Sequence, residues 1–118
     1  MARGRHICLD YKGFQGEGKW MLEIMRDAVG KSECREVHAH VEQFDGDVSP
    51  PGFAAVVLID ESHVSAHCYA DQGLLAIDCF TCGGIEPDDI VDDIHMALQR
   101  AIPEIELVQK SRLDRFVD

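Results

Sequence analysis

The sequence predicts an α+β protein in which a mainly antiparallel sheet carries two helices packed on one face, a two-layer sandwich. Two amphipathic stretches have the spacing of helices, and short apolar or alternating segments separated by turn residues have the spacing of strands. Each helical stretch has one apolar stripe, so both helices can cover the same side of a sheet. The 118 residues suffice for one domain with its own core, which we assign to residues 1–118.

The expected elements alternate along the chain. The expected strands are residues 6–11, 35–44, 53–59, 63–69 and 74–82, with a last short strand near 105–108. The first expected helix has apolar positions from Trp20 onward and is closed by Gly30. The second begins at Pro87 and is ended by Pro103. The strands within residues 53–82 are joined by short turns, which predicts a meander.

Composition and charge limit the partners of the chain. Hydrophobic residues make up 46% and charged residues 28%, which is ordinary for a soluble globular fold. A net charge of -11 disfavours nucleic acids and acidic membranes, so we expect a small cationic or neutral partner.

The longest apolar run, 53–59, is too short to span a membrane, and no apolar signal stretch follows the N-terminus, so we expect a cytoplasmic location. Arg112, Asp114 and Arg115 are candidates for partner contacts or for a solvated tail, and the tail is favoured.

Cysteine and histidine patterns do not predict a metal or redox site. The five cysteines are an odd number without a secretory signal, which favours reduced thiols. Cys79 and Cys82 form a C-x-x-C, but residues three apart on a strand point to opposite faces. The histidine pairs 38/40 and 63/67 lack a matching carboxylate or thiolate pattern. We therefore expect no metal.

The segment D-E-S-H-V-S-A-H-C at 60–68 places a serine between an acid and a histidine, straight after an apolar strand. Ser62, His67 and Cys82 lie in or next to adjacent strands, where residues distant in sequence can converge. A Ser-His-acid hydrolase would place its nucleophile in G-x-S-x-G, whereas Ser62 follows Glu61 and precedes a histidine. A hydrolase is therefore disfavoured, and a strand-edge turn or a self-reacting bond remains.

Residues 60–84 resemble the core of the small prokaryotic S-adenosylmethionine decarboxylases, with E-S-H, a histidine four residues later, and F-T-C-G at 80–83. The resemblance extends to G-R-H at 4–6 and to P-x-G-x-x-x-V-V-x-I before the serine. It implies that the protein cleaves its own Glu61–Ser62 bond. The serine hydroxyl would take the acyl group from nitrogen, β-elimination would cut the chain, and hydrolysis of the dehydroalanine would leave a pyruvoyl group.

The resemblance also implies a cofactor, residue roles and a partner. The pyruvoyl group at position 62 would form a Schiff base with the substrate amine and hold the electrons left after CO2 departs. His67 would be the acid or base of self-cleavage, and Cys82 would be the proton donor during turnover. Phe44 sits near where the family places an aromatic that stacks on adenine. Two protomers would form a homodimer whose active sites each receive residues from both, and the product would serve spermidine synthesis.

The sequence departs from the family pattern where substrate recognition and processing are decided. Family members commonly have H-T-W-P where this chain has H-C-Y-A at 67–70. They also commonly have a serine eight residues before the reactive one, where this chain has Ala54; Ser65 or a water could take its place. Three interpretations stay open: an S-adenosylmethionine decarboxylase, an ornithine or arginine decarboxylase with the same cofactor, and an unprocessed binding or regulatory subunit.

Overall fold

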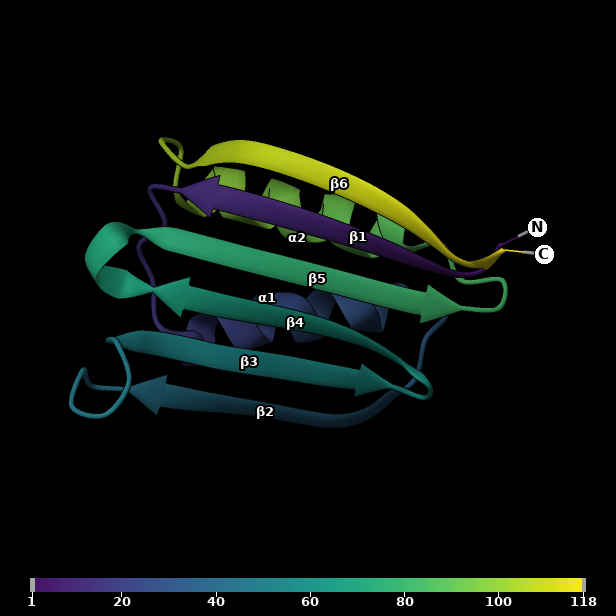
Figure 1. The fold of residues 1–118 in the computed structure, drawn as a ribbon, viewed down its shortest axis with the longest axis horizontal. Helices are drawn as coiled ribbons and strands as arrows, with labels where there is room; N and C mark the ends of the chain where they lie inside the picture. The colour runs from purple at the N-terminus through teal and green to yellow at the C-terminus, as the bar shows by residue number, and fades with distance from the viewer. Residues whose placement is uncertain (1, 118) are drawn as a thin grey trace.

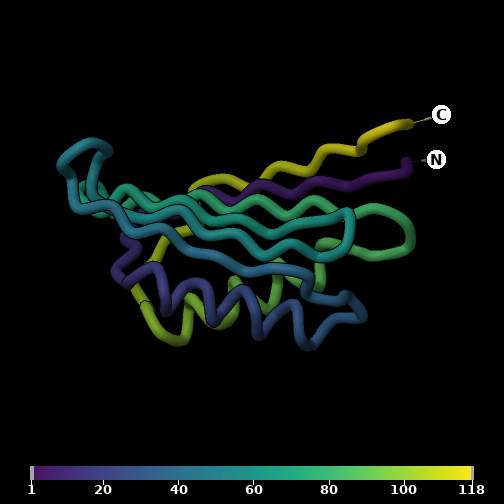
Figure 2. Tube along the Cα trace, turned by 90° about the horizontal axis from the view of Figure 1, so that it is seen from below, coloured from purple at the N-terminus to yellow at the C-terminus, as the bar shows by residue number. Residues whose placement is uncertain are grey.

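The alternating segments of the sequence form one antiparallel sheet in the computed structural model, which describes residues 2–117 (Figure 1). Its strands are β1 (Ala2–Lys12), β2 (Glu36–Phe44), β3 (Gly52–Ile59), β4 (Ser62–Tyr69), β5 (Leu74–Cys82) and β6 (Glu106–Val117). Its helices are α1 (Gly18–Lys31) and α2 (Pro87–Ala101), and a short 3-10 helix, η1 (Ala70–Gln72), joins β4 to β5. Both helices lie on one side of the sheet (Figure 2), so the predicted α+β sandwich is confirmed.

The strand order is β2-β3-β4-β5-β1-β6, and each neighbouring pair is antiparallel. The predicted meander is confirmed as β3, β4 and β5. The N-terminal strand β1 lies between β5 and β6, which are distant from it in sequence. We call the end of the sheet with the β3–β4 turn the turn end, and the end with the β2–β3 loop and η1 the loop end (Figure 1).

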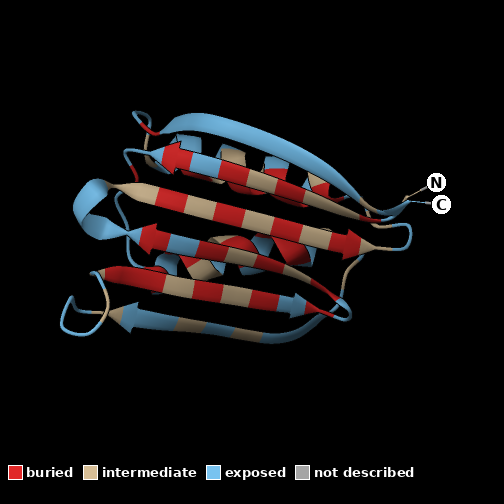
Figure 3. Cartoon of the chain, viewed as in Figure 1, coloured by how far each residue is buried: buried red, intermediate tan, exposed pale blue. Residues whose placement is uncertain are grey.

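Buried side chains alternate along the inner strands and face the helices (Figure 3). The helices add their apolar stripes, which contain Met21, Met25, Ala28, Val29, Ile90, Val91, Ile94 and Leu98. No helix covers the opposite side of the sheet, which we call the open face (Figure 2). The side chains there are half-buried or exposed, so this face is available for chemistry or contact.

The first helix is longer than predicted. Gly30 remains helical, and the expectation that it closes the helix is wrong. The end is made by Ser32 instead, whose N–H donates to the Val29 carbonyl at 3.0 Å. Trp20 is 37% exposed, so the buried stripe of α1 is narrower than expected. Within residues 2–117, neither this helix nor any other is long and apolar enough to cross a membrane. The cytoplasmic location stays a prediction.

The last strand runs for 12 residues rather than the four expected at 105–108. The residues assigned to a solvated tail, Arg112, Asp114 and Arg115, lie within this strand, so that prediction is wrong. Arg112 donates to Asp88 at 2.6 Å, and the Arg115 guanidinium lies 5.7 Å from the centre of the Phe80 ring. Almost all side chains of β6 are exposed, so the apolar alternation that marks a strand is absent. Backbone pairing with β1 orders it instead.

Candidate active site

Ser62 is the first residue of β4 and follows a two-residue turn, Asp60–Glu61. The turn closes a hairpin in which Ile59 pairs with Ser62. Asp60 has a φ of 52°, a positive value that tight hairpin turns need and that Asp tolerates better than most residues. Glu61 is exposed, whereas Ser62 is 5% exposed and its Oγ accepts a hydrogen bond from the Cys82 N–H at 3.1 Å. The bond between them thus joins an exposed residue to a buried hydroxyl.

Cys82 is the last residue of β5, the strand next to Ser62. Side chains alternate along β5, so Cys79 is fully buried against the helices while Cys82 is half-buried on the other side. The prediction that the two sulfurs of the C-x-x-C diverge is confirmed. Burial raises the pKa of Cys79 to about 12, which makes it an inert core thiol. The structure therefore brings the Ser62 hydroxyl to the Cys82 backbone, while the Cys82 thiol lies on the opposite face of the sheet.

His67 does not reach Ser62 within one chain. The two residues are five positions apart on β4, which corresponds to roughly 16 Å at about 3.3 Å per residue. An odd separation also places their side chains on opposite faces, and Ser62 is buried while His67 is exposed. The expected convergence of His67 with Ser62 is therefore wrong for a single protomer. Residues converge across neighbouring strands, whereas residues on one extended strand stay apart.

His67 lies instead at the loop end, together with Phe44. Ala54 lies directly across from His67 on β3, so the hydroxyl that the family pattern places at position 54 would stand beside this imidazole. Phe44 ends β2 and shares with His67 the lining of a cavity of about 220 Å³. We call Ser62 with Cys82 the reactive half-site, and His67, Ala54 and Phe44 the histidine half-site. The two half-sites occupy opposite ends of the sheet.

A shallow hollow of about 520 Å³ extends over the open face from His67 to His63. The His63 ring lies 6.0 Å from the Phe80 ring and 6.4 Å from the His6 ring, measured between centroids. Burial, and then the neighbouring His6, lower the pKa of His63, so its imidazole is neutral near pH 7. Sequence reasoning missed His6 and His63 as neighbours of the reactive half-site. Both histidines lie directly across from Phe80 of the F-T-C-G motif, on the same face of the sheet, and this pairing links them to the reactive half-site.

Comparison with known proteins decides the family. A family model described as S-adenosylmethionine decarboxylase matches residues 5–111, a range that contains both half-sites. The chain belongs to the S-adenosylmethionine decarboxylase family. The resemblance carried by E-S-H and F-T-C-G is therefore confirmed, as is the prediction of a carboxy-lyase family.

Relatives in this S-adenosylmethionine decarboxylase family match most of the chain. A protein of Symbiobacterium thermophilum named S-adenosylmethionine decarboxylase proenzyme is 34% identical over 100 residues, which cover 80% of this chain and 73% of that protein. A protein of the same name from Archaeoglobus fulgidus is 38% identical over 87 residues, covering 70% and 74%. The crystal structure of the adenosylmethionine decarboxylase from Aquifex aeolicus matches with a TM-score of 0.78 and 25% identity, over 99% of this chain and 93% of that one.

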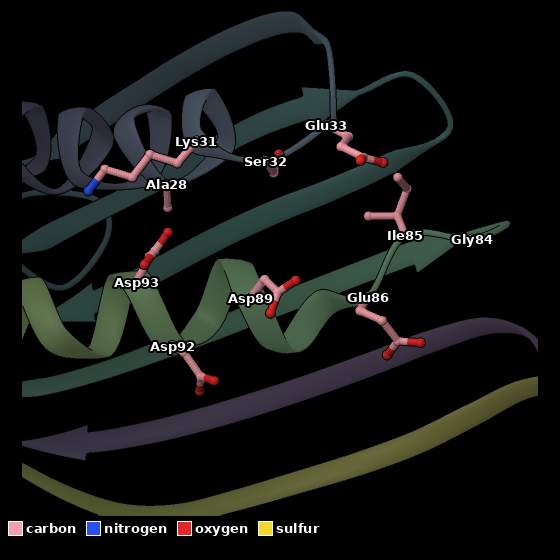
Figure 4. Close-up of a pocket in the computed structure, with 10 residues that line it drawn as sticks. All are labelled: Ala28, Lys31, Ser32, Glu33, Gly84, Ile85, Glu86, Asp89, Asp92 and Asp93. Atoms are coloured by element: carbon pink, nitrogen blue, oxygen red, sulfur yellow. The ribbon is translucent and has the colours of Figure 1, made fainter.

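A separate acidic cavity of about 500 Å³ lies where the end of α1 meets the start of α2 (Figure 4). Its lining includes the carboxylates of Glu33, Glu86, Asp89 and Asp93. Figure 4 shows Asp93 pointing from α2 toward Ala28 of α1. Acidic residues at the start of α2 agree with the favourable interaction of carboxylates with a helix N-terminus. Neither half-site of this S-adenosylmethionine decarboxylase family member lines the cavity.

Proposed function

We propose that this chain is a pyruvoyl-dependent S-adenosylmethionine decarboxylase that makes its own cofactor by cleaving between Glu61 and Ser62. The observation that carries the proposal is the buried Ser62 hydroxyl, held by the Cys82 N–H directly after the tight turn. The names of the relatives support it, because those proteins are called proenzymes. The decarboxylated product would be the aminopropyl donor for spermidine synthesis.

Ser62 supplies both the nucleophile and the atoms of the cofactor. Its oxygen has a fixed donor and little room to rotate, which favours attack on the adjacent Glu61 carbonyl carbon. The new C–O bond forms as the C–N bond breaks, and the amide nitrogen takes a proton. Loss of the proton on the Ser62 Cα then expels Glu61 as a carboxylate, and water converts the remaining dehydroalanine into a pyruvoyl group and ammonia.

The reactive half-site fits this group. A pyruvoyl carbonyl at position 62 supplies an electron sink for the loss of CO2 from an amino-acid substrate. The Cys82 N–H, released from the serine hydroxyl, stays as a donor beside position 62. The half-buried Cys82 side chain belongs to the same half-site, where its thiol would donate a proton to the substrate α-carbon. A net charge of -11 favours a cationic substrate, and the sulfonium of S-adenosylmethionine is a cation.

We infer that the complete site forms between two protomers. Two open faces stacked in antiparallel orientation would bring the histidine half-site of one protomer to the reactive half-site of the other. Such a two-fold arrangement would bring His67 of the partner subunit to the Glu61–Ser62 bond from the open face, the side away from the Ser62 hydroxyl. Leu58 and Leu113 on the open face are 40% and 57% exposed, which supports burial of this face against a second copy.

The histidine half-site favours a nucleoside substrate over a basic amino acid. Phe44 and Tyr69 line the same cavity, and Tyr69 is 46% exposed there. Two aromatic rings at one place suit the adenine of S-adenosylmethionine, since planar rings stack favourably. Ornithine and arginine carry no aromatic ring and would leave this surface unused. Tyr69 thus offers an aromatic ring at the position where the family commonly has tryptophan.

Intact-mass measurement of the purified protein tests the cleavage. We expect two fragments, residues 1–61 and 62–118, the second starting with a ketone instead of an amine. Ser62→Ala should abolish the split. A Ser62→Ala chain that still splits at this bond would show contaminating proteolysis and would remove the support for self-cleavage.

Release of labelled CO2 from S-adenosylmethionine tests the reaction. Cys82→Ala should preserve chain cleavage and lower CO2 release, because the thiol is placed in turnover rather than in processing. An uncleaved wild-type chain that releases no CO2 would overturn the proposal in favour of a binding or regulatory subunit. CO2 release from ornithine or arginine alone would agree with the pyruvoyl chemistry but would contradict S-adenosylmethionine as the substrate.

A further inference from the structure

Three metal-ligating side chains meet on the open face between β1 and β5. His6 and Cys8 belong to β1, and Asp78 belongs to β5. His6 Nε2 lies 3.0 Å from Asp78 Oδ1, and Cys8 Sγ lies 3.1 Å from the same oxygen. One ligand atom of each residue lies within 4.8 Å of the other two. In the part of the chain that the structure describes, no other histidine, cysteine and carboxylate group gathers three ligand atoms in this way.

The sheet holds these three residues in place. Cys8 and Asp78 are directly opposite each other in the antiparallel register, and His6 is two residues before Cys8 on the same face. Both β1 and β5 are interior strands with partners on each side. Their backbones are therefore fixed, and only side-chain rotations are needed to bring the three donor atoms to a common ion. Donors held on rigid elements in this way form a preorganised site.

We propose that His6, Cys8 and Asp78 bind one zinc ion, with ligands that are not the residues assigned to decarboxylation. Imidazole nitrogen, thiolate sulfur and carboxylate oxygen are the ligand types of zinc, and three protein ligands leave a fourth tetrahedral position for water. The side chains of His6 and Asp78 are 22% and 33% exposed in the single protomer, which gives an ion access from solvent before a second copy covers the open face. On binding, the Cys8 thiol releases its proton to solvent and its sulfur bonds to zinc.

Other roles for the cluster fit the geometry less well. Burial, and then the hydrogen bond to Asp78, raise the pKa of Cys8 to about 11, so this thiol is not an activated nucleophile. If only hydrogen bonds hold the cluster, His6 and Cys8 both bond to the same oxygen, Asp78 Oδ1. A cation uses all three donors and compensates the negative charge of a thiolate next to a carboxylate. The combination of nitrogen, sulfur and oxygen ligands therefore favours a transition metal over a redox role.

The ion would act on the sheet rather than on the reaction. Asp78 lies roughly 13 Å from Cys82 along β5, at about 3.3 Å per residue, and His6, the ligand nearest the reactive half-site, lies opposite Phe80, so bound zinc would border that half-site without being held by Ser62 or Cys82. It would instead join the N-terminal strand to the meander through side chains as well as backbone. Because an ion that binds only the folded state stabilises it, zinc should raise the melting temperature of the full chain.

Cobalt(II) titration of the metal-free full chain tests the site, with Co²⁺ as the spectroscopic probe. We expect one Co²⁺ per chain, a thiolate-to-cobalt charge-transfer band, and displacement of the band by Zn²⁺. Cys8→Ser should remove the band, and Asp78→Asn should weaken binding about 10-fold or more. The matched control Cys34→Ser, a half-buried cysteine outside the cluster, should keep the band.

A second variant of the protein provides the test if Cys8→Ser does not fold. Cys34→Ser combined with Cys82→Ser leaves Cys8 as the thiol on the open face, because Cys68 and Cys79 are buried against the helices. That chain should still show the charge-transfer band. The proposal is overturned if the band is absent from wild type, if it survives Cys8→Ser, or if it disappears from the double variant. A wild-type melting temperature that Zn²⁺ leaves unchanged would also overturn it.

Discussion

Two variants that each fail to cleave should restore cleavage when they share a dimer. Ser62→Ala lacks the nucleophile, and His67→Ala lacks the imidazole, so each homodimer should remain uncleaved. Within one chain these residues are roughly 16 Å apart along β4, at about 3.3 Å per residue, and on opposite faces. A proton transfer requires heavy atoms about 3 Å apart. The two groups must therefore come from different chains if both serve one reaction.

Random pairing of equal amounts sets the size of the effect. About half of the dimers are then mixed, and each mixed dimer has one site with both groups and one with neither. In the working site, the serine belongs to the His67→Ala chain. We therefore expect about half of the His67→Ala chains to split, and none of the Ser62→Ala chains. Co-expression with different affinity tags followed by intact-mass measurement distinguishes the two chains.

Two results would refute this arrangement. Isolated mixed dimers that stay uncleaved would show that His67 does not act across the interface. His67→Ala homodimers that split at the wild-type rate would show that the imidazole is not required at all. The matched control pairs Ser62→Ala with a chain that carries both substitutions, and it should stay uncleaved because it contains no serine nucleophile.

Further predictions concern processing, packing and charge. Ala54→Ser should speed fragment formation, measured by mass over time, because it adds a hydroxyl across from the site histidine; Ala39→Ser, on the helix-facing side of β2, should not. Ile94→Ala should lower the free energy of unfolding in urea by about 2–5 kcal/mol, because Ile94 is fully buried. The hydrogen bond from Arg112 holds the pKa of Asp88 below its usual value, so its stabilisation exists above about pH 4 and is lost as the pH falls. Arg112→Ala should therefore lower the urea midpoint at about pH 7 and have a smaller effect at about pH 3.

The parts of the fold that bury a face could be predicted from the sequence. The strands 53–59, 63–69 and 74–82 have apolar alternation or continuous apolar runs, and the structure has β3, β4 and β5 there. The segment 106–117 lacks this pattern because almost all its side chains are exposed. Its order comes from backbone hydrogen bonds to β1, which carry no residue-type signal. An edge strand of this kind is recognised only when its neighbour is known.

The local motifs name candidate site residues but do not predict how those residues are arranged. Ser62 and Cys82 were expected to converge, and the Ser62 hydroxyl does meet the Cys82 backbone N–H, but the Cys82 side chain lies on the other face of the sheet. His67 was expected with them, although the parity rule that separates Cys79 from Cys82 also separates position 62 from position 67. The odd spacing of five positions between 62 and 67 on one strand was enough to predict that their side chains lie on opposite faces. Residues that belong to one sequence motif can thus lie on opposite faces of the sheet.

The cluster of His6, Cys8 and Asp78 shows what single-strand reasoning cannot supply. The histidine pairs 38/40 and 63/67 each lie within one strand, and within residues 2–117 they gather no third ligand. The cluster depends on β1 pairing with β5 across about 70 residues of chain, in the register that sets Cys8 opposite Asp78. A shift of that register by one residue would move Asp78 away from Cys8 and turn its neighbours to the other face. The same register sets His6 opposite Phe80, so whatever fixes the pairing of β1 with β5 also fixes the surroundings of the reactive half-site.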